Sequence, residues 1–304
     1  MAKHSNRIKK TSGDIVMDVV IYILLTLLAL ICLYPLYQVV VDSFSDPNIV
    51  MKKNGLLFKI EGFQVDAYKM VFSNKNIATG FKNSLFYIVV GTGIQFLTTV
   101  TAAYVLSKKG AMLKKPIMIF FAITMYFGGG LIPSFLLVNK MGLMDTCWAI
   151  LLPGACNVWN IIIMRTQFVN IPDGLKEVAT IDGASDVTIL FRILIPLSGA
   201  VIAVLVLFSA VGYWNMWYEP MISLTKRSQY PIQSVLREIL IDSNAQMMAG
   251  AGKTQIKLSN TKDPAIQTLV KYANIVVCTI PILVVYPFAQ KYFVKGVMVG
   301  SLKG

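Results

Sequence analysis

The segment EVATIDGASDVTILFRILIP, from Glu177 to Pro196, is a polar interruption in an otherwise apolar chain. Its charged residues are Glu177, Asp182, Asp186 and Arg192. The neighbouring stretches 147–164 and 193–218 contain no Asp, Glu, Lys or Arg. Because charged side chains are costly inside a bilayer, this segment is expected to lie at a membrane surface.

The apolar residues of the 304-residue chain cluster into long runs. The chain is 56% hydrophobic and only 14% charged, compared with about 25% charged residues in an average soluble domain. A helix needs roughly 20 apolar residues to cross the hydrocarbon core. Stretches of this length occur at 18–41, 84–107, 116–138, 147–168, 195–217 and 269–291. A closed barrel would give short alternating segments instead, so the sequence predicts an all-α, polytopic membrane protein with six transmembrane helices.

The residues typical of metal and acid–base sites are scarce. All four cysteines, Cys32, Cys147, Cys156 and Cys278, lie within or at the edge of predicted spans, without disulfide or metal-ligand spacing. His4 is the only histidine. We therefore expect no catalytic residue, no metal site and no cofactor. The net charge of +13 is scattered over all loops, which favours anionic membrane lipid over nucleic acid as a partner.

The distribution of Lys and Arg predicts the orientation, because these residues are enriched near span ends on the cytoplasmic face. Six spans place both chain ends on one side. The 28 basic residues divide equally between the two sides, but those on the side of the chain ends lie in shorter segments. This density predicts an N-in, C-in protein of the bacterial cytoplasmic membrane. The expected parts are a cytoplasmic tail 1–17, a membrane domain 18–291, extracellular loops 42–83 and 218–268, a cytoplasmic loop 169–194 and a cytoplasmic tail 292–304.

The second outer loop contains a further helical pattern. In YPIQSVLREILI, from Tyr230 to Ile241, apolar residues recur at helical spacing. This pattern predicts an amphipathic outer helix that lies on the membrane or on a partner.

Local patterns in the polar segment predict a helix, a turn and a second helix. One stripe of the first helix collects the apolar residues Ile171, Leu175, Val178 and Ile181. Gly183 breaks this helix, and Ser185 can cap a second one that runs to Pro196, where the fifth span begins. A connector resting on lipid would favour Lys and Arg on its polar face, whereas this face is mostly acidic. The segment therefore suits a socket on another protein better than a lipid surface.

The segment resembles the EAA signature of binding-protein-dependent ABC importer permeases, E-A-A-x3-G-x9-I-x-L-P. The matching positions here are Glu177, Val178, Ala179, Gly183, Ile193, Ile195 and Pro196. Val178 replaces alanine and Ile195 replaces leucine, and both changes keep the apolar character. The match lies in the expected place, between the fourth and fifth predicted spans.

Four other stretches are similar to carbohydrate-uptake permeases, most of all to the branch for complex sugars and oligosaccharides. They are FGGGLIPSFLLVNKMGLMDTCWAILLPG (127–154), WN (214–215), YPIQSVLREIL (230–240) and KYFVKGVMVGSLKG (291–304). The resemblance implies the type I permease fold of ABC importers. It also implies a second homologous permease subunit, two ATPase subunits, and an extracellular solute-binding lipoprotein or periplasmic binding protein. The chain has no G-x-x-x-x-G-K-[ST] motif, so ATP hydrolysis is expected in a separate subunit.

In that family the polar loop forms a coupling helix that docks into a cleft on the ATPase. The resemblance therefore predicts ATPase-coupling residues at Glu177, Val178, Ala179, Ile181, Asp182, Gly183 and Ala184. Among them, we expect the apolar residues to make the contact and Gly183 to let the turn fit closely.

A substrate pathway is predicted where polar and irregular residues interrupt the spans. Glycines and Pro133 weaken the third span, and an irregular backbone in a bilayer is tolerated where it lines a cavity or is packed in protein. Amide groups bind sugar hydroxyls and aromatic rings stack on sugar faces. The candidate lining residues are Phe127, Gly128, Gly129, Gly130, Asn157, Trp159, Asn160, Tyr213, Trp214 and Asn215. Close helix packing and interface anchoring are the alternative roles for these glycines and aromatic residues.

Two other functions remain open at this stage. One is the same type of importer carrying an amino acid or a peptide. The other is a secondary carrier. Ion-coupled carriers usually need ionisable groups inside the membrane, and the predicted spans carry almost none, which favours an external energy source and a neutral substrate.

Overall fold

The computed structural model describes residues 11–53, 55, 57–249 and 264–301, and every regular element in these ranges is a helix. The all-α prediction is therefore confirmed for this part of the chain. Parts of the expected tail 1–17, outer loop 218–268 and tail 292–304 lie outside the described residues, namely 1–10, 250–263 and 302–304. The chain divides into two compact units, residues 1–71 with 259–276 and residues 72–258 with 277–304.

The first unit is built on α1 (Ser12–Ser43), an apolar helix of 32 residues. At 1.5 Å per residue it is about 48 Å long, which exceeds the roughly 30 Å of a hydrocarbon core. The backbone N–H of Thr11 donates to the Asp14 carboxylate at 2.9 Å, which stabilises the start of the helix. The unit also holds α2 (Pro47–Lys52), most of α3 (Asp66–Ser73) and the first part of α15 (Pro264–Ser301).

The loop that follows α1 is folded. The ring of Phe44 stacks on the rings of Phe63 and Tyr68, with centroids 5.8 and 4.7 Å apart. The Asp46 side chain accepts hydrogen bonds from the first backbone N–H groups of α2. The Ser43 hydroxyl lies 2.7 Å from the Tyr68 hydroxyl. These contacts explain how a polar stretch between two spans keeps a defined shape.

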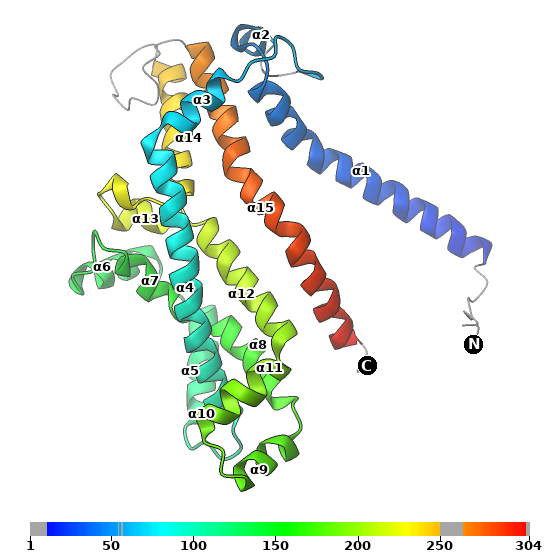
Figure 1. The fold of residues 1–304 in the computed structure, drawn as a ribbon, viewed down its shortest axis with the longest axis vertical. Coiled ribbons are helices and arrows are strands. Elements are labelled where there is room, and N and C mark those ends of the chain that lie inside the picture. The colour runs from blue at the N-terminus through cyan, green and yellow to red at the C-terminus, as the bar shows by residue number, and fades with distance from the viewer. Residues whose placement is uncertain (1–10, 54, 56, 250–263, 302–304) are drawn as a thin grey trace. The chain divides into compact units, whose positions relative to one another are not determined.

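The second unit is organised around α4 (Lys75–Ser107), a helix of 33 residues. It packs against α7 (Trp148–Gly154), α8 (Val158–Val169), α12 (Gly199–Trp214) and α14 (Ile232–Ala249) (Figure 1). Near the C-terminal part of α4, a buried apolar cluster joins this helix to α8, to α12 and to residues 189–194. Its members include Val100, Tyr104, Met164, Phe168, Ile189, Leu194 and Leu205.

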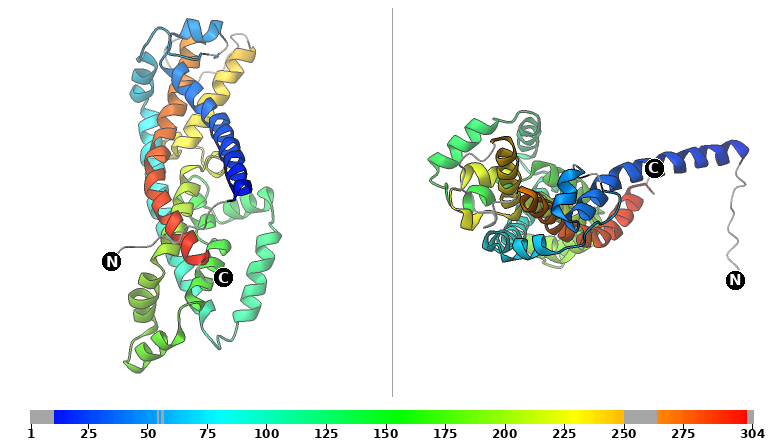
Figure 2. Two further views of the ribbon diagram at one scale, coloured as in Figure 1. Left: turned by 90° about the vertical axis from the view of Figure 1, so that its right-hand side faces the viewer. Right: turned by 90° about the horizontal axis from the view of Figure 1, so that it is seen from above.

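Three of the six predicted spans are each divided by a bend into two helices. Helices α5 (Lys114–Tyr126) and α6 (Leu131–Lys140) meet at 117°, and Figure 2 shows the chain turning sharply between them. Helices α7 and α8 meet at 41°. The helical stretch 186–197 meets α12 at 87°. Six spans result only if each bent pair counts as one, beside the three continuous apolar helices that begin at Ser12, Lys75 and Ala265.

The breaks occur where the sequence cannot continue a straight helix. Gly130 has a φ of 81°, a left-handed conformation that only glycine adopts without strain. Asn157 separates α7 from α8, and its side chain accepts from the Asn160 N–H at 3.1 Å, which begins the second helix. Pro196 lacks the N–H that would bond to the carbonyl of Arg192, and the chain turns two residues later. The long apolar helix α12 therefore begins at Gly199, after this bend.

The predicted outer helix is present as α14, but its apolar side is covered by the same chain. Ile232, Val235 and Ile239 are buried. Gly80 on α4 allows this close packing, because a Cβ there would lie 3.1 Å from the Ile232 Cα. The expectation that this face rests on lipid or a partner is wrong for these three residues. Two short elements, α13 (Tyr218–Ser223) and η2 (Arg227–Gln229), precede the helix.

Candidate coupling segment and translocation cavity

The polar segment forms the predicted helix, glycine turn and second helix. The first helix is α9 (Asp173–Ile181). Gly183 follows with a φ of 79°, and the Ala184 N–H donates back to the Ala179 carbonyl at 2.9 Å. This is the left-handed glycine that ends many helices, since an L side chain is strained there.

The second helix begins as predicted and ends at Leu197, one residue beyond Pro196. The Ser185 hydroxyl accepts from the Thr188 N–H at 3.3 Å, which caps α10 (Asp186–Thr188). The chain continues through a π-helical stretch, η1 (Ile189–Leu194), into α11 (Ile195–Leu197). Single π turns inside helices are rare and occur often at functional sites.

The apolar stripe of α9 is largely uncovered within this chain. Leu175, Val178 and Ile181 are 48%, 59% and 85% exposed, and Ile171 at the start of the stripe is buried. Val187, just beyond the glycine turn, is 66% exposed. An exposed apolar face on a polar, surface-lying segment is typical of a docking surface.

The predicted coupling residues divide into two groups. Val178 and Ile181 point away from the buried cluster, together with the exposed residues Glu177, Asp182 and Gly183. Ala179 and Ala184 are only partly exposed and pack against the buried cluster of the same chain. The larger apolar side chains are therefore the uncovered part of the segment, and the two alanines pack inward and seat it on the buried cluster.

Two lysines at the end of α4 contact the two helices of this segment. The Lys109 Nζ lies 2.6 Å from an Asp173 carboxylate oxygen at the start of α9. The Lys108 Nζ lies 2.6 Å from an Asp186 carboxylate oxygen at the start of α10, and the Tyr104 hydroxyl donates to the same carboxylate at 2.7 Å. Each lysine thus anchors one helix of the pair.

These contacts shift the titration of both aspartates. Hydrogen bonds from Lys109 and then Lys176 hold the pKa of Asp173 below its usual value of 3.8. Hydrogen bonds from Lys108 and then Tyr104 do the same to the pKa of Asp186. Both carboxylates are consequently ionised, and both ion pairs formed, at neutral pH.

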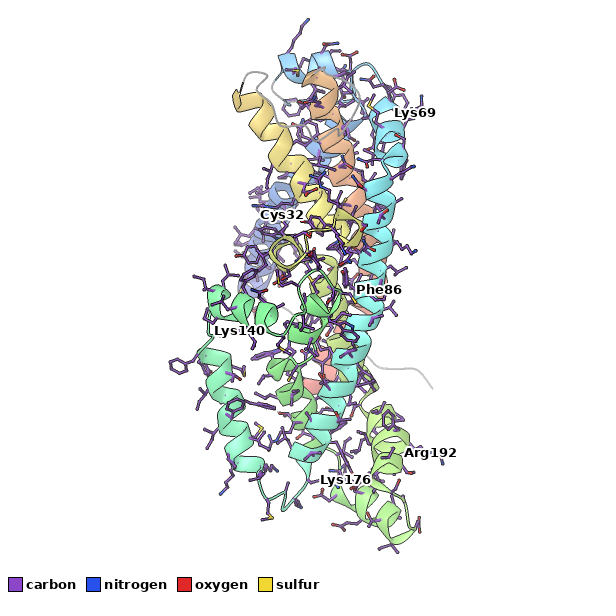
Figure 3. All side chains as sticks on the ribbon, turned by 90° about the vertical axis from the view of Figure 1, so that its left-hand side faces the viewer. Cys32, Lys69, Phe86, Lys140, Lys176 and Arg192 are labelled. Carbon is purple, nitrogen blue, oxygen red and sulfur yellow. The ribbon has the colours of Figure 1, made fainter. Side chains whose placement is uncertain are left out.

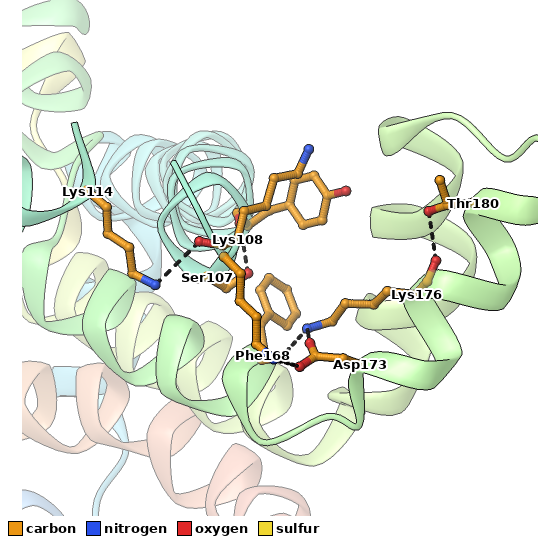
Figure 4. Close-up of polar contacts among 9 residues, drawn as sticks. Ser107, Lys108, Lys114, Phe168, Asp173, Lys176 and Thr180 are labelled. Carbon is orange, nitrogen blue, oxygen red and sulfur yellow. Dashed lines mark hydrogen bonds and ion pairs between the residues drawn. The ribbon is translucent and has the colours of Figure 1, made fainter. Parts of the chain in front are cut away.

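Lys176 ties α9 back to the end of α8. Its Nζ donates to the Phe168 carbonyl at 3.1 Å and lies 3.4 Å from the Asp173 carboxylate (Figure 4). Figure 3 shows Lys176 and Arg192 together at the end of the second unit that lies far from Phe86. Arg165 on α8 donates to the Leu106 carbonyl at 3.1 Å, which joins α8 to the same end of α4.

A cavity of about 980 Å³ lies elsewhere in the second unit, among α4, α6, α7, α8, α12 and α13. Six predicted pathway residues line it: Gly130, Asn157, Trp159, Asn160, Tyr213 and Asn215. Four others do not: Phe127, Gly128, Gly129 and Trp214. Trp214 instead packs against Phe81, with ring centroids 6.0 Å apart. The first three belong to the break between α5 and α6.

The cavity wall holds a polar cluster, of which the sequence singled out only Asn160. Gln95 on α4 donates through Nε2 to the Gly154 carbonyl at 2.8 Å, and its Oε1 accepts from the Ser209 hydroxyl. The Asn160 amide lies 3.4 Å from the same Oε1. The Thr98 hydroxyl donates to the Ala155 carbonyl. Gln95 and Thr98 thus donate to carbonyl groups that have no helical partner because the chain breaks between α7 and α8.

Tyr213 is a packed element of this wall rather than a freely accessible sugar platform. Its ring lies so close to Gly91 and Gly154 that a Cβ at either position would clash with it. It is only 7% exposed, and its hydroxyl has no hydrogen-bond partner among the described residues. Only glycine at these two positions allows the ring to fit between α4 and α7.

Two loops contact each other next to Ser223, which lines the cavity. Asp145 accepts from the N–H and the hydroxyl of Thr225 at 2.5 and 2.7 Å, and its own N–H donates to the Ser223 carbonyl at 3.0 Å. The hydrogen bond from the Thr225 hydroxyl is the main cause that lowers the pKa of Asp145. Glu219 is the one charged side chain among the described residues that line the cavity. The wall is therefore largely apolar and amide-bearing.

Sequence reasoning missed the partners of the polar segment and of the cavity wall. The sequence shows Lys108 and Lys109 only as two of the basic residues near a span end, which indicate orientation. Gln95 and Tyr104 lie within an apolar span and match no motif. Their polar side chains are still the one indication that the sequence offers, because a hydrogen-bonding side chain in such a span needs a buried partner.

The chain is similar to proteins of known type over nearly its whole length. Residues 96–299 match the family described as binding-protein-dependent transport system inner membrane component. The chain is 40% identical to the polygalacturonan/rhamnogalacturonan transport system permease protein YtcP of Bacillus subtilis, over 94% of this chain and 98% of that protein. It is 38% identical to protein LplC of Bacillus subtilis, over 97% of each chain.

A solved structure shows the same fold. It is that of a bacterial ABC transporter involved in the import of the acidic polysaccharide alginate. The match covers 94% of this chain and 99% of that chain, with a TM-score of 0.83 and 33% identity. The same family is indicated by the fold, by the exposed helix–glycine–helix segment, by the family match and by these relatives. The chain belongs to the family of binding-protein-dependent transport system inner membrane components, the permease subunits of ABC importers.

Proposed function

We propose that this chain is one transmembrane subunit of an ATP-driven, binding-protein-dependent importer of oligosaccharides. It works with a second, homologous permease subunit and two separate ATPase subunits. An extracellular solute-binding lipoprotein or a periplasmic binding protein delivers the sugar. This chain supplies part of the translocation path and a coupling segment at residues 169–194.

The observation that carries the proposal is the uncovered apolar face of α9. Leu175, Val178 and Ile181 would be placed in water if nothing docked on them. Burying a large aliphatic side chain contributes roughly 1.5–3 kcal/mol, so three of them give a docking surface of useful strength. The acidic residues around the stripe are unfavourable for anionic lipid, which leaves a protein socket as the better occupant.

The contacts at the two ends of α4 support the proposed N-in, C-in orientation. The coupling segment contacts its C-terminal end at Tyr104 and Lys108, whereas α14 packs beside Gly80 near its N-terminal end. These contacts are separated by more than twenty residues, roughly 35 Å of helix, which is enough to cross a bilayer core. With the coupling segment in the cytoplasm, both chain ends are also cytoplasmic and the loops 42–83 and 218–268 face outward.

The cavity supports a carbohydrate as the transported solute. Asn157 and Trp159 are exposed and present an amide group and an aromatic ring to the space, and these groups suit sugar hydroxyls and sugar faces. A volume of about 980 Å³ has room for a multi-ring ligand. The names of the relatives point to polysaccharide-derived substrates, such as that of the polygalacturonan/rhamnogalacturonan system.

The test is reconstitution of the complete transporter in proteoliposomes. The chain is purified with the permease and ATPase encoded beside it, and the matching binding protein is loaded with a labelled oligosaccharide. We expect uptake that requires ATP, the ATPase and the binding protein. The panel contains acidic and neutral oligosaccharides, a peptide and an amino acid.

Each result decides between the proposal and its rivals. Peptide or amino acid uptake without sugar uptake would overturn the substrate class. Uptake that continues without ATPase and collapses with an ionophore would identify a secondary carrier and overturn the coupling role of α9.

A further inference from the structure

We propose that the end of α4 forms a coupling strap, made of Tyr104, Lys108 and Lys109, that sets the angle between the two helices of the coupling segment. The strap rests on the proposed function, since it concerns how the segment transmits movement to the ATPase. Its members are positioning residues that act through Asp173 and Asp186.

The strap contacts the segment on both sides of its hinge. Lys109 holds Asp173, ten residues before Gly183, and Lys108 with Tyr104 holds Asp186, three residues after it. Ala179 and Ala184 seat the turn on the buried cluster, whereas Gly183 itself has open space where a Cβ would be. One short stretch of α4 thus contacts both helices beyond the turn, at the first residue of each.

Each aspartate is also well placed for this role within its own helix. Asp173 and Asp186 are the first residues of α9 and α10, where the helix dipole favours a negative charge. Each carboxylate thus stabilises the N-terminus of its own helix and also pairs with a lysine of the strap. A change in the direction of either helix has to break or move one of these contacts.

The same helix leads from the strap to the cavity. Gln95 on α4 belongs to the polar cluster of the cavity wall and binds the carbonyl of Gly154 at the break between α7 and α8. Lys108 follows 13 residues later, which is about 20 Å along a rigid helix. Rigid helices with two alternative arrangements are the elements that carry coupling between distant sites. We infer that α4 reports the state of the cavity to the coupling segment through this strap.

Lysines near the ends of membrane spans often serve only to set the orientation of the protein in the membrane. Exposed ion pairs are also individually weak. Here two consecutive lysines reach two different helices, and one pair is reinforced by a tyrosine hydroxyl. Measured strengths of exposed pairs correspond to a change of roughly 1.5- to five-fold in an equilibrium constant for each pair removed. A change of this size should hardly affect assembly with the ATPase. It is measurable in the ratio of the sugar transport rate to the ATP hydrolysis rate.

The experiment measures sugar transported per ATP hydrolysed in proteoliposomes containing the whole transporter. Lys108→Ala and Lys109→Ala are each expected to lower this ratio by roughly 1.5- to five-fold, while ATPase co-purification stays at the wild-type level. Lys115→Ala changes an exposed lysine at the start of α5 and is the matched control, with no change expected.

Conservative and charge-swap variants separate positioning from a merely structural role. Lys108→Arg should retain coupling. Lys108→Asp combined with Asp186→Lys should couple better than either single variant, because the pair is re-formed with opposite polarity. An unchanged ratio in both alanine variants would overturn the strap, and so would a charge-swap pair no better than its single variants. If instead the wild-type transporter shows no sugar uptake driven by ATP, the proposed function fails rather than the strap.

Discussion

Ile181 offers the sharpest test of the coupling surface, because it is 85% exposed in this chain and lies at the end of α9. Ile181→Ala removes three carbon atoms, worth about 0.8 kcal/mol each when fully buried. Scaled by the 85% of the side chain that is open to a partner, the loss is about 2 kcal/mol, or roughly 30-fold in the dissociation constant. Ile181→Val removes one carbon and should cost only about three-fold.

The assay is a titration of purified ATPase against the permease pair held in nanodiscs, for the wild type and both variants. Folding of the free permease should hardly change, since exposed side chains away from special features contribute within about 0.5 kcal/mol. Thr180→Ala, on the same helix, is the matched control and should bind like the wild type. Equal affinities for wild type, Val and Ala, or a larger loss from Glu177→Gln than from Ile181→Ala, would refute an apolar contact at this position.

Three further outcomes follow from the geometry. Gly183→Val should lower ATPase co-purification more than Gly183→Asn, because valine in a left-handed conformation costs about 1–2 kcal/mol whereas asparagine tolerates it; equal effects would contradict this. Gln95→Leu should lower the melting temperature in detergent by an amount equivalent to about 1–3 kcal/mol, since it leaves the Gly154 carbonyl without its donor; an unchanged melting temperature would argue against this hydrogen bond. The depressed pKa values of Asp173 and Asp186 mean that their ion pairs stabilise the fold above the ordinary value of 3.8 and are lost only as pH falls through the lowered values. Coupling should therefore be constant from about pH 8 to about pH 5, and a loss beginning near pH 6 would show that another group controls it.

The sequence alone determined the features that depend on short stretches of chain. Hydropathy over about twenty residues gave the helical membrane class, because the bilayer requires each span to satisfy its own backbone. The helix, turn and helix around Gly183 were predictable because a left-handed glycine and a serine cap act within a few residues. For the same reason, helical spacing predicted that Val178 and Ile181 share one apolar face.

The tertiary structure decided what depends on partners far apart in the chain. The bend between α7 and α8 leaves the carbonyl groups of Gly154 and Ala155 without partners inside a helix. Gln95 and Thr98 of α4 donate hydrogen bonds to these two groups, so the bend depends on a distant part of the chain. The aromatic residues near the ends of spans divided between the cavity and the core according to their neighbours: Trp159 lines the space, whereas Trp214 packs on Phe81.

The pairing of Lys108 with Asp186 shows the same limit most clearly, because 78 positions separate the two residues. A sequence shows the charge of each residue and the helix start at Asp186. It does not show that α4 ends beside that start. The contact exists because the buried cluster around Phe168 and Leu194 brings α4, α8 and the polar segment together. Such packing is a property of the whole fold, since each apolar residue has many alternative neighbours of similar chemistry and only the assembled core selects among them.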